Sequence, residues 1–116
     1  MTQEEKQLLL KDLCARLPYG TQVVYNGITE TLSTLHIFDM THIKEVYVDI
    51  KPYLRPMSSV SKMWGGLTKE EIENPWILFD SPVDALNYFL TNHIDFRGLI
   101  PMGLALEAPE DMYKTE

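Results

Sequence analysis

Three side chains able to hold or move a proton alternate along one short segment: His93, Asp95 and Arg97. In an extended chain, alternate side chains project to the same side, which would place a base beside two charges, as in general acid–base catalysis. Aspartate and arginine two residues apart also commonly pair across turns or cap helices. We therefore expect a structural role for this trio and no enzymatic activity.

The other residue types that support catalysis or metal binding lack partners. Ser58 and Ser59 have no histidine nearby in the sequence to activate them, so a turn or a cap is the expected role. The histidines are scattered, the single cysteine stands alone, and Gly65-Gly66 lacks the lysine and hydroxyl of a phosphate-binding loop (His36, His42, His93; Cys14). The sequence predicts no metal, no cofactor and no catalytic residue.

A better candidate for binding is the segment 50–56, where Lys51, Tyr53 and Arg55 alternate. Cations interleaved with an aromatic ring can contact phosphates while the ring stacks on a base. The favoured alternative is that Tyr53 and Leu54 anchor the segment in the core while the two cations offset neighbouring acids. Its prolines, Pro52 and Pro56, remove two backbone donors, so we expect a stiff joint outside any helix interior or central strand.

Two tryptophans complete the set of candidate residues. Trp64 and Trp76 lie in loop-rich sequence, where they are either core aromatics or part of an exposed apolar patch at a protein interface. We expect a protein partner more than a nucleic acid. The candidate ligand- or partner-binding residues are Lys51, Tyr53, Arg55, Trp64 and Trp76.

The formal charge of -7 is concentrated late in the chain, because residues 61–116 carry four basic and ten acidic side chains. Acidic balance argues against a general nucleic-acid binder, whose affinity rests on neutralising phosphates. It leaves open an acidic decoy that binds a DNA-binding host protein.

The length of 116 residues fits one domain, 1–116, with a helix in 1–20, a sheet in 21–56 and a helical, loop-rich part in 57–116. No segment approaches the roughly 20 apolar residues that span a bilayer, and the first residues do not resemble a signal peptide. We expect a cytoplasmic protein without a membrane partner.

The first helix is predicted by a capping box at Thr2 and Glu5, and Pro18-Tyr19-Gly20 should end it. Its leucines lie along one face, with Cys14 beside them (Leu9, Leu13, Leu17). We expect Cys14 to be a small buried side chain.

Strand formers follow from residue 21. Asn26-Gly27 predicts a hairpin between 21–25 and 28–35, and the runs at 37–40 and 43–50 predict two further strands. Short strands joined by tight turns favour an antiparallel, curled, barrel-like sheet of four to five strands covered by the helix.

The last part is predicted to be mainly helical. A weak helix in 57–66 ends at Gly65-Gly66, Thr68 opens a short helix closed by Asn74-Pro75, and Ser81-Pro82 begins a longer one that continues to Asn92. The apolar run 76–79 is expected to form a buried strand or an anchoring loop, and the end from 108 to fray. The fold class is thus α+β.

Three sequence blocks, LCARLPYG at 13–20, IKPYLRPMSS at 50–59 and DFRGLI at 95–100, together resemble a group of small uncharacterised proteins of gut bacteria and their phages or prophages. The resemblance implies no known activity and no site residue. It implies a phage- or prophage-type accessory protein in a bacterial cytoplasm, which we interpret as a non-enzymatic binding or protein-interaction module. A nucleic-acid or nucleotide binder using Lys51, Tyr53 and Arg55, and the acidic decoy, are the alternatives.

Overall fold

The computed structural model describes residues 2–42 and 49–113. Within them the chain forms α1 (Gln3–Arg16), β1 (Gln22–Tyr25), β2 (Ile28–Thr31), α2 (Thr34–His42), β3 (Ile50–Leu54), α3 (Ser59–Trp64), α4 (Lys69–Glu73), α5 (Pro82–Thr91) and β4 (Leu106–Glu107). Two 3-10 helices, η1 (Leu17–Tyr19) and η2 (Pro75–Leu78), complete the order. The predicted α+β class, with an N-terminal helix, a sheet and a helical C-terminal part, is confirmed.

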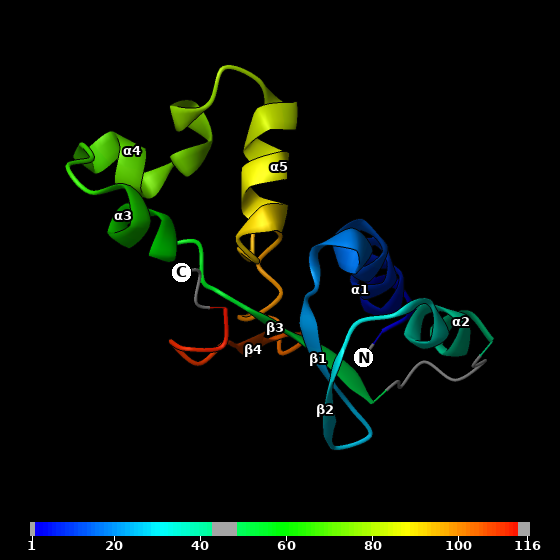
Figure 1. Cartoon of the computed structure of the whole chain (residues 1–116). Coiled ribbons are helices and arrows are strands. Elements are labelled where there is room, and N and C mark those ends of the chain that lie inside the picture. The colour runs from blue at the N-terminus through cyan, green and yellow to red at the C-terminus, as the bar shows by residue number, and fades with distance from the viewer. Residues whose placement is uncertain (1, 43–48, 114–116) are drawn as a thin grey trace.

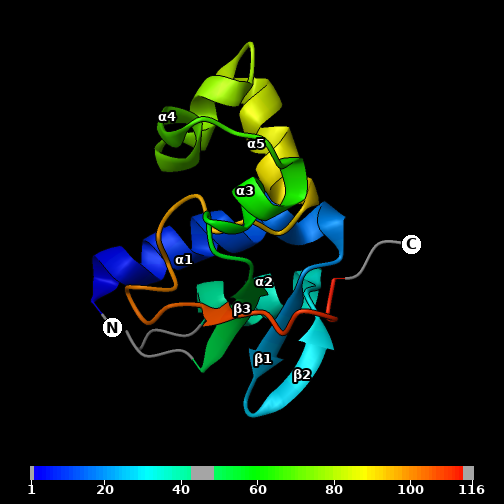
Figure 2. The same cartoon turned by 90° about the vertical axis from the view of Figure 1, so that its left-hand side faces the viewer.

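The arrangement has two parts. Figure 1 shows α1 and α2 packed near the sheet, with α3, α4 and α5 extending away from it, and Figure 2 shows α1 lying between the sheet and these helices. Each part has its own buried cluster. One is centred on Leu9, Leu13 and Val23, and the other on Phe89 and Ile94. The residues between the clusters therefore decide how the two parts are joined.

The ends of α1 follow their local signals. Thr2 and Glu5 form the reciprocal capping box, and Gly20 ends the helical region with a positive φ of 69°. The prediction for Cys14 is wrong, because this side chain is exposed. Leu9, Leu13 and Arg16 share the buried face at spacings of four and three residues, which turns Cys14 outward.

The hairpin is confirmed, since β1 and β2 pair antiparallel through Tyr25 and Ile28. Asn26 and Gly27 both have positive φ, as a type I′ turn requires. The strand predicted at 37–40 is wrong: these residues lie in α2, which buries His36 and Met40 on one face. A spacing of four residues matches a helix. In the predicted strand 43–50, residues 43–48 lie outside the described residues.

The exclusion of segment 50–56 from a central strand is wrong. The sheet has the order β2-β1-β3-β4, so β3, which contains Pro52, has a neighbour on both sides. Asn26 donates its backbone N–H to Asp49, and because hydrogen-bonded pairs alternate in an antiparallel ladder, Pro52 opposite Val23 is a non-hydrogen-bonded position. On the other side, the pairing to β4 begins only at Tyr53. The missing N–H of Pro52 therefore breaks no ladder bond.

The fourth strand also departs from the antiparallel expectation, because β4 pairs parallel to β3. The whole helical part lies between these strands in the sequence and supplies the long crossover that a parallel pair needs. Among the described residues, β2 and β4 are the edge strands and the sheet is not closed.

The helical part mostly follows its predicted boundaries. Thr68 caps α4 with a second capping box, and Ser81 caps α5 ahead of Pro82. The run 76–79 is not the buried strand that was one of its two predicted forms, because Pro75 opens the 3-10 helix η2 and Trp76 and Ile77 are exposed. Its end does anchor this part of the chain, since Leu78 and Phe79 are half-buried against the second cluster. No helix among the described residues is long and apolar enough to cross a membrane.

Candidate functional site

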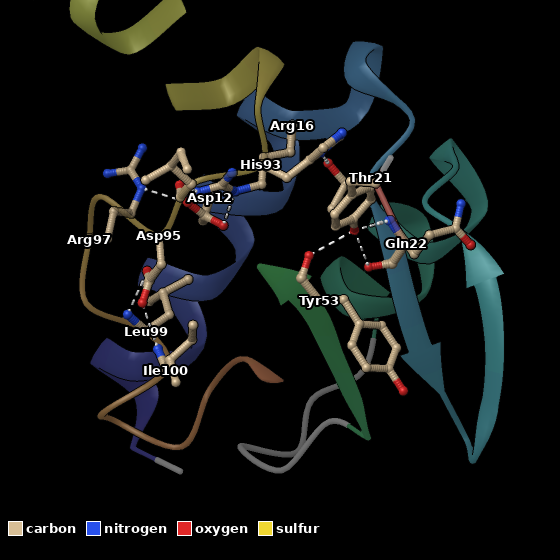
Figure 3. A network of polar contacts seen from close by, with 12 residues as sticks. Asp12, Arg16, Thr21, Gln22, Tyr53, His93, Asp95, Arg97, Leu99 and Ile100 are labelled. Atoms are coloured by element: carbon tan, nitrogen blue, oxygen red, sulfur yellow. Dashed lines mark hydrogen bonds and ion pairs between the residues drawn. The ribbon is translucent and has the colours of Figure 1, made fainter. Parts of the chain in front are cut away.

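A buried ion network joins the two parts of the fold (Figure 3). The Nε atom of Arg16 donates to Asp12 at 2.7 Å, and its Nη2 atom donates to the backbone oxygen of Ile94, also at 2.7 Å. Arg97 reaches the other oxygen of Asp12 at 3.0 Å. Both Arg16 and Asp12 are fully buried. The Asp12 carboxylate on α1 thus binds two guanidinium groups that come from different parts of the chain.

The same two arginines flank one aromatic ring. The guanidinium carbons of Arg16 and Arg97 lie 5.2 and 4.8 Å from the centre of the Phe96 ring. The remaining nitrogen of Arg16, Nη1, is buried without a hydrogen-bond partner among the described residues. The Arg16 guanidinium has a cation–π contact with the ring of Phe96, which is favourable where Nη1 lacks a hydrogen-bond acceptor.

Asp95 stabilises the turn that follows it. Its two carboxylate oxygens accept the backbone N–H groups of Leu99 and Ile100 at 2.8 and 2.9 Å. Its own backbone N–H bonds to Arg55. The buried carboxylate therefore acts as a cap for the loop 95–100.

His93 lies in a third environment. Its Nδ1 is 3.2 Å from the hydroxyl of Thr21, and its ring stacks on Tyr113 with the centroids 3.7 Å apart. Burial, together with the positive charges of Arg16 and Arg55, lowers the pKa of His93 to about 4. The imidazole is therefore neutral near pH 7.

Tyr113 fastens the last described residues to the sheet. Its hydroxyl accepts from the backbone N–H of Gln22 and donates to the backbone oxygen of Tyr53, each at 2.7 Å. Arg55 donates to the backbone oxygens of Tyr113 and Asn92. Burial raises the pKa of Tyr113 to about 12. The predicted fraying from residue 108 is thus wrong as far as Tyr113, because this residue is bonded to both β1 and β3.

His93, Asp95 and Arg97 therefore do not act on one shared point. His93 faces Thr21, Asp95 caps a turn, and Arg97 pairs with Asp12 instead of Asp95. Among the described residues, no group of three histidine, cysteine, aspartate or glutamate side chains is placed to hold a metal ion.

The two cations of the predicted binding segment have different roles: Lys51 is exposed to solvent, whereas Arg55 is held by contacts within the fold. Lys51, Tyr53 and Arg55 share the face of β3 opposite Ile50 and Leu54, so Tyr53 and Leu54 cannot both point into the core as expected. Lys51 is exposed and Tyr53 half-buried. Arg55 is half-buried, and its guanidinium bonds to two carbonyls and lies over the ring of Tyr113. Of the two cations, Lys51 is the more accessible.

The tryptophans lie at two ends of one aromatic cluster. Trp64 makes edge contacts with Phe79 and Tyr88, with both centroid distances 5.7 Å, and is 45% exposed. Trp76 packs edge-on against Phe89 at 4.9 Å and is 37% exposed. Phe89 and Phe79, 5.7 Å apart, connect them. Each tryptophan therefore combines a core contact with a solvent-facing surface.

Three of these rings and one methionine lie at the Trp64 end of the cluster, and we call them the aromatic surface: Met63, Trp64, Phe79 and Tyr88. The hydroxyl of Tyr88 lies 3.9 Å from the sulfur of Met63, which joins this residue to the rings. Met63 and Trp64 are both exposed. Further exposed apolar side chains on the same helical part are Ile72, Ile77 and Val83.

A groove of about 730 Å³ opens beside this surface, where β3 and β4 end and the chain diverges. One wall comes from Arg55, Pro56 and α3, and the other from the end of β4 and the segment after it. We call it the charged groove, and its lining residues are Arg55, Pro56, Ser59, Lys62, Met63, Glu107, Ala108, Pro109 and Glu110.

Of the candidate residues predicted from sequence, only Arg55 lines this groove, and its neighbours there were not predicted. Lys62, Glu107 and Glu110 come from segments whose proximity depends on the pairing of β3 with β4. In the sequence, the lining shows only as charged residues next to apolar ones: Lys62 beside Met63, and Glu107 and Glu110 on either side of Ala108-Pro109.

No protein-family model, curated protein or solved structure matches this chain. The candidate surfaces are therefore interpreted from their own geometry.

Proposed function

We propose that the chain is a non-enzymatic protein-interaction module that binds its partner through the aromatic surface on α3 and α5. The observation that carries this proposal is Trp64, which is nearly half exposed yet fixed against Phe79 and Tyr88. A large ring held in one orientation loses little conformational entropy on binding, and tryptophan and tyrosine are enriched among the residues that dominate interface energies.

The charge around this surface favours a partner with basic side chains. Residues 65–92 contain one basic residue, Lys69, and five acidic ones: Glu70, Glu71, Glu73, Asp80 and Asp84. Four of the five are exposed, and Glu71 is half-buried. Charges near an interface help to select the partner, so the acidic balance of the chain between α3 and the end of α5 favours a basic one.

The phage- or prophage-type accessory role in a bacterial cytoplasm remains part of this proposal. It rests on the three sequence blocks at 13–20, 50–59 and 95–100.

The exposed acids around α4 also favour a second candidate, the acidic decoy of a DNA-binding protein. The two candidates differ in what should disrupt binding. An interaction centred on Trp64 depends on the ring, whereas a decoy depends on the number of acids and should weaken steeply with salt. The nucleic-acid alternative has less support, because Arg55 faces a groove that also contains the acidic side chains of Glu107 and Glu110, which would repel phosphates.

The experiment compares affinity capture from a bacterial lysate by the wild-type chain, Trp64→Ser and Leu35→Ser. Leu35 lies on α2, is 72% exposed and is the matched control for losing an exposed apolar side chain. We expect a protein that the wild type and Leu35→Ser retain but Trp64→Ser loses. Loss of a central aromatic anchor should weaken the purified pair by about 30-fold or more, from at least ~2 kcal/mol.

Circular dichroism must first show that Trp64→Ser keeps the native helix content. If retention of every captured protein is the same for all three chains, the proposal is wrong. The decoy is favoured instead if Trp64→Ser still captures the partner protein but a variant with both Glu70 and Glu73 changed to glutamine does not.

A further inference from the structure

The charged groove has walls of opposite sign. Arg55, which follows β3, and Lys62 on α3 contribute the positive groups, while Glu107 at the end of β4 and Glu110 beyond it contribute the negative groups. Within residues 2–42 and 49–113, none of these four side chains forms an ion pair. The groove therefore holds separated charges of both signs that do not neutralise each other by direct contact.

The backbone explains how the walls are kept apart. β3 and β4 run parallel and end side by side, with the last contact between them from the N–H of Ala108 to the oxygen of Leu54. Beyond this bond, Arg55 pairs with the segment 93–95, and the segment after β3 continues into α3. The segment after β4 instead continues through Pro109. Parallel strands whose connections diverge at their carboxyl ends leave a crevice there, a frequent place for ligands.

One charged group of the groove, the guanidinium of Arg55, is held in place before any ligand arrives. The guanidinium of Arg55 is fixed by Asn92 and Tyr113, and Tyr113 is in turn bonded to β1 and β3. A preorganised site loses less entropy on binding. Apolar residues lie among the charged ones on both walls: Pro56, Met63, Ala108 and Pro109.

These features point to one class of ligand. Nucleic acids and other polyanions would be repelled by Glu107 and Glu110, and polycations by Arg55 and Lys62. A ligand with both charges and apolar parts between them matches the lining. The volume of about 730 Å³ lies within the roughly 300–1,000 Å³ range of sites for drug-sized ligands, enough for a segment of several residues and more than one free amino acid needs.

We propose that the charged groove binds an extended peptide segment of mixed charge, with an acidic residue toward Arg55 and Lys62 and a basic residue toward Glu107 and Glu110. The inference rests on the proposed function, because Met63 lines the groove and also contacts Tyr88 of the aromatic surface. One partner can therefore occupy both, with its apolar anchor on Trp64 and the adjoining segment in the groove.

The test uses an array of blocked octapeptides that carry lysine and glutamate at varied spacing, beside purely acidic and purely basic sets. The tightest mixed-charge peptide is then titrated by calorimetry into the wild type, Lys62→Glu and Glu110→Lys. The matched controls are Lys69→Glu and Glu73→Lys, which reverse exposed charges on α4 outside the groove lining. Backbone amide NMR shifts on titration locate the site.

We expect mixed-charge peptides to bind best, and each groove variant to raise the dissociation constant about 5- to 10-fold while the controls change it less than about twofold. Replacing the peptide's glutamate by lysine should restore affinity for Lys62→Glu. The inference is overturned if no peptide binds, or if peptides of a single sign bind equally well or better. It is also overturned if the groove and control variants have equal effects, or if the largest amide shifts lie outside residues 55–63 and 107–110.

The two proposals fail separately. Trp64 does not line the groove, so loss of partner capture in Trp64→Ser with no peptide binding would leave the interaction module and remove the groove ligand. Peptide binding without any capture that depends on Trp64 would do the reverse.

Discussion

At the scale of single residues, the most consequential side chain is Arg16, a fully buried cation that lies where the helical pattern of α1 would place a leucine. It contacts Asp12 on its own helix and the oxygen of Ile94 and the ring of Phe96 beyond it. Since a buried charge is stable only when paired and hydrogen-bonded, these contacts fix the position of the loop after α5 relative to α1.

Arg16→Met should therefore destabilise the fold by about 3 kcal/mol, because it leaves Ile94 without its donor and Asp12 with Arg97 alone. Urea unfolding followed by circular dichroism measures the change. Lys11→Met, an exposed position on the same helix, is the control and should shift stability by less than about 0.5 kcal/mol. A loss below about 1 kcal/mol for Arg16→Met would mean that the network contributes little.

His93 predicts a specific pH dependence. Its folded pKa, about 4, lies below the unfolded value near 6.5, so the unfolded chain binds the proton first as the pH falls. Stability should be fully present above about pH 6.5 and decline between 6.5 and 4. His93→Asn, which tolerates the positive φ of 59°, should flatten the decline.

The measurement is the free energy of unfolding in urea at several pH values. His42→Asn, at an exposed histidine, serves as the control and should keep the wild-type slope. The same slope in His93→Asn would assign the pH dependence to other groups.

At the scale of elements, the turn between β1 and β2 sets the register of the sheet. Gly27 has a φ of 82°, a conformation that costs other residues about 1–2 kcal/mol. Gly27→Ala should lower the melting temperature accordingly, and Thr29→Ala, on the exposed strand β2, should lower it less. The space around Gly27 is open, so a clash cannot explain the effect. Equal melting temperatures for the two variants would contradict this role of the turn.

At the scale of the whole molecule, the segment through Tyr113 closes the fold by connecting β1, β3 and Arg55. Tyr113 bonds to Gln22 and Tyr53, stacks on His93 and accepts from Arg55. It also fixes Arg55 at one wall of the charged groove. The stability of this segment and the shape of the groove are therefore linked.

Tyr113→Phe should cost about 1–2 kcal/mol, because it keeps the ring but leaves the N–H of Gln22 without its acceptor. Hydrogen exchange should speed up at Gln22 and in the segment after β4, and remain unchanged in α5. Tyr19→Phe, at the half-buried tyrosine of η1, is the control. Unchanged exchange at Gln22 would contradict the role of this hydroxyl.

The sequence by itself determined the elements whose signals are local. The capping boxes of α1 and α4, the Asn26-Gly27 turn and the Ser81-Pro82 start of α5 depend on residues within a few positions of each other, and all are present. For the tryptophans the sequence left two alternatives open, and the structure combines them, because each ring packs on the aromatic cluster and also faces solvent.

Only the tertiary structure decided the features that join distant segments. Pro52 fits a central strand because of the register of β1 and the late start of β4. Arg16 is buried because Ile94 and Phe96 lie beside α1. The charged groove exists because two parallel strands diverge. Local hydrogen bonds and backbone preferences can be read along the chain, whereas these contacts depend on which surfaces pack together after the elements form.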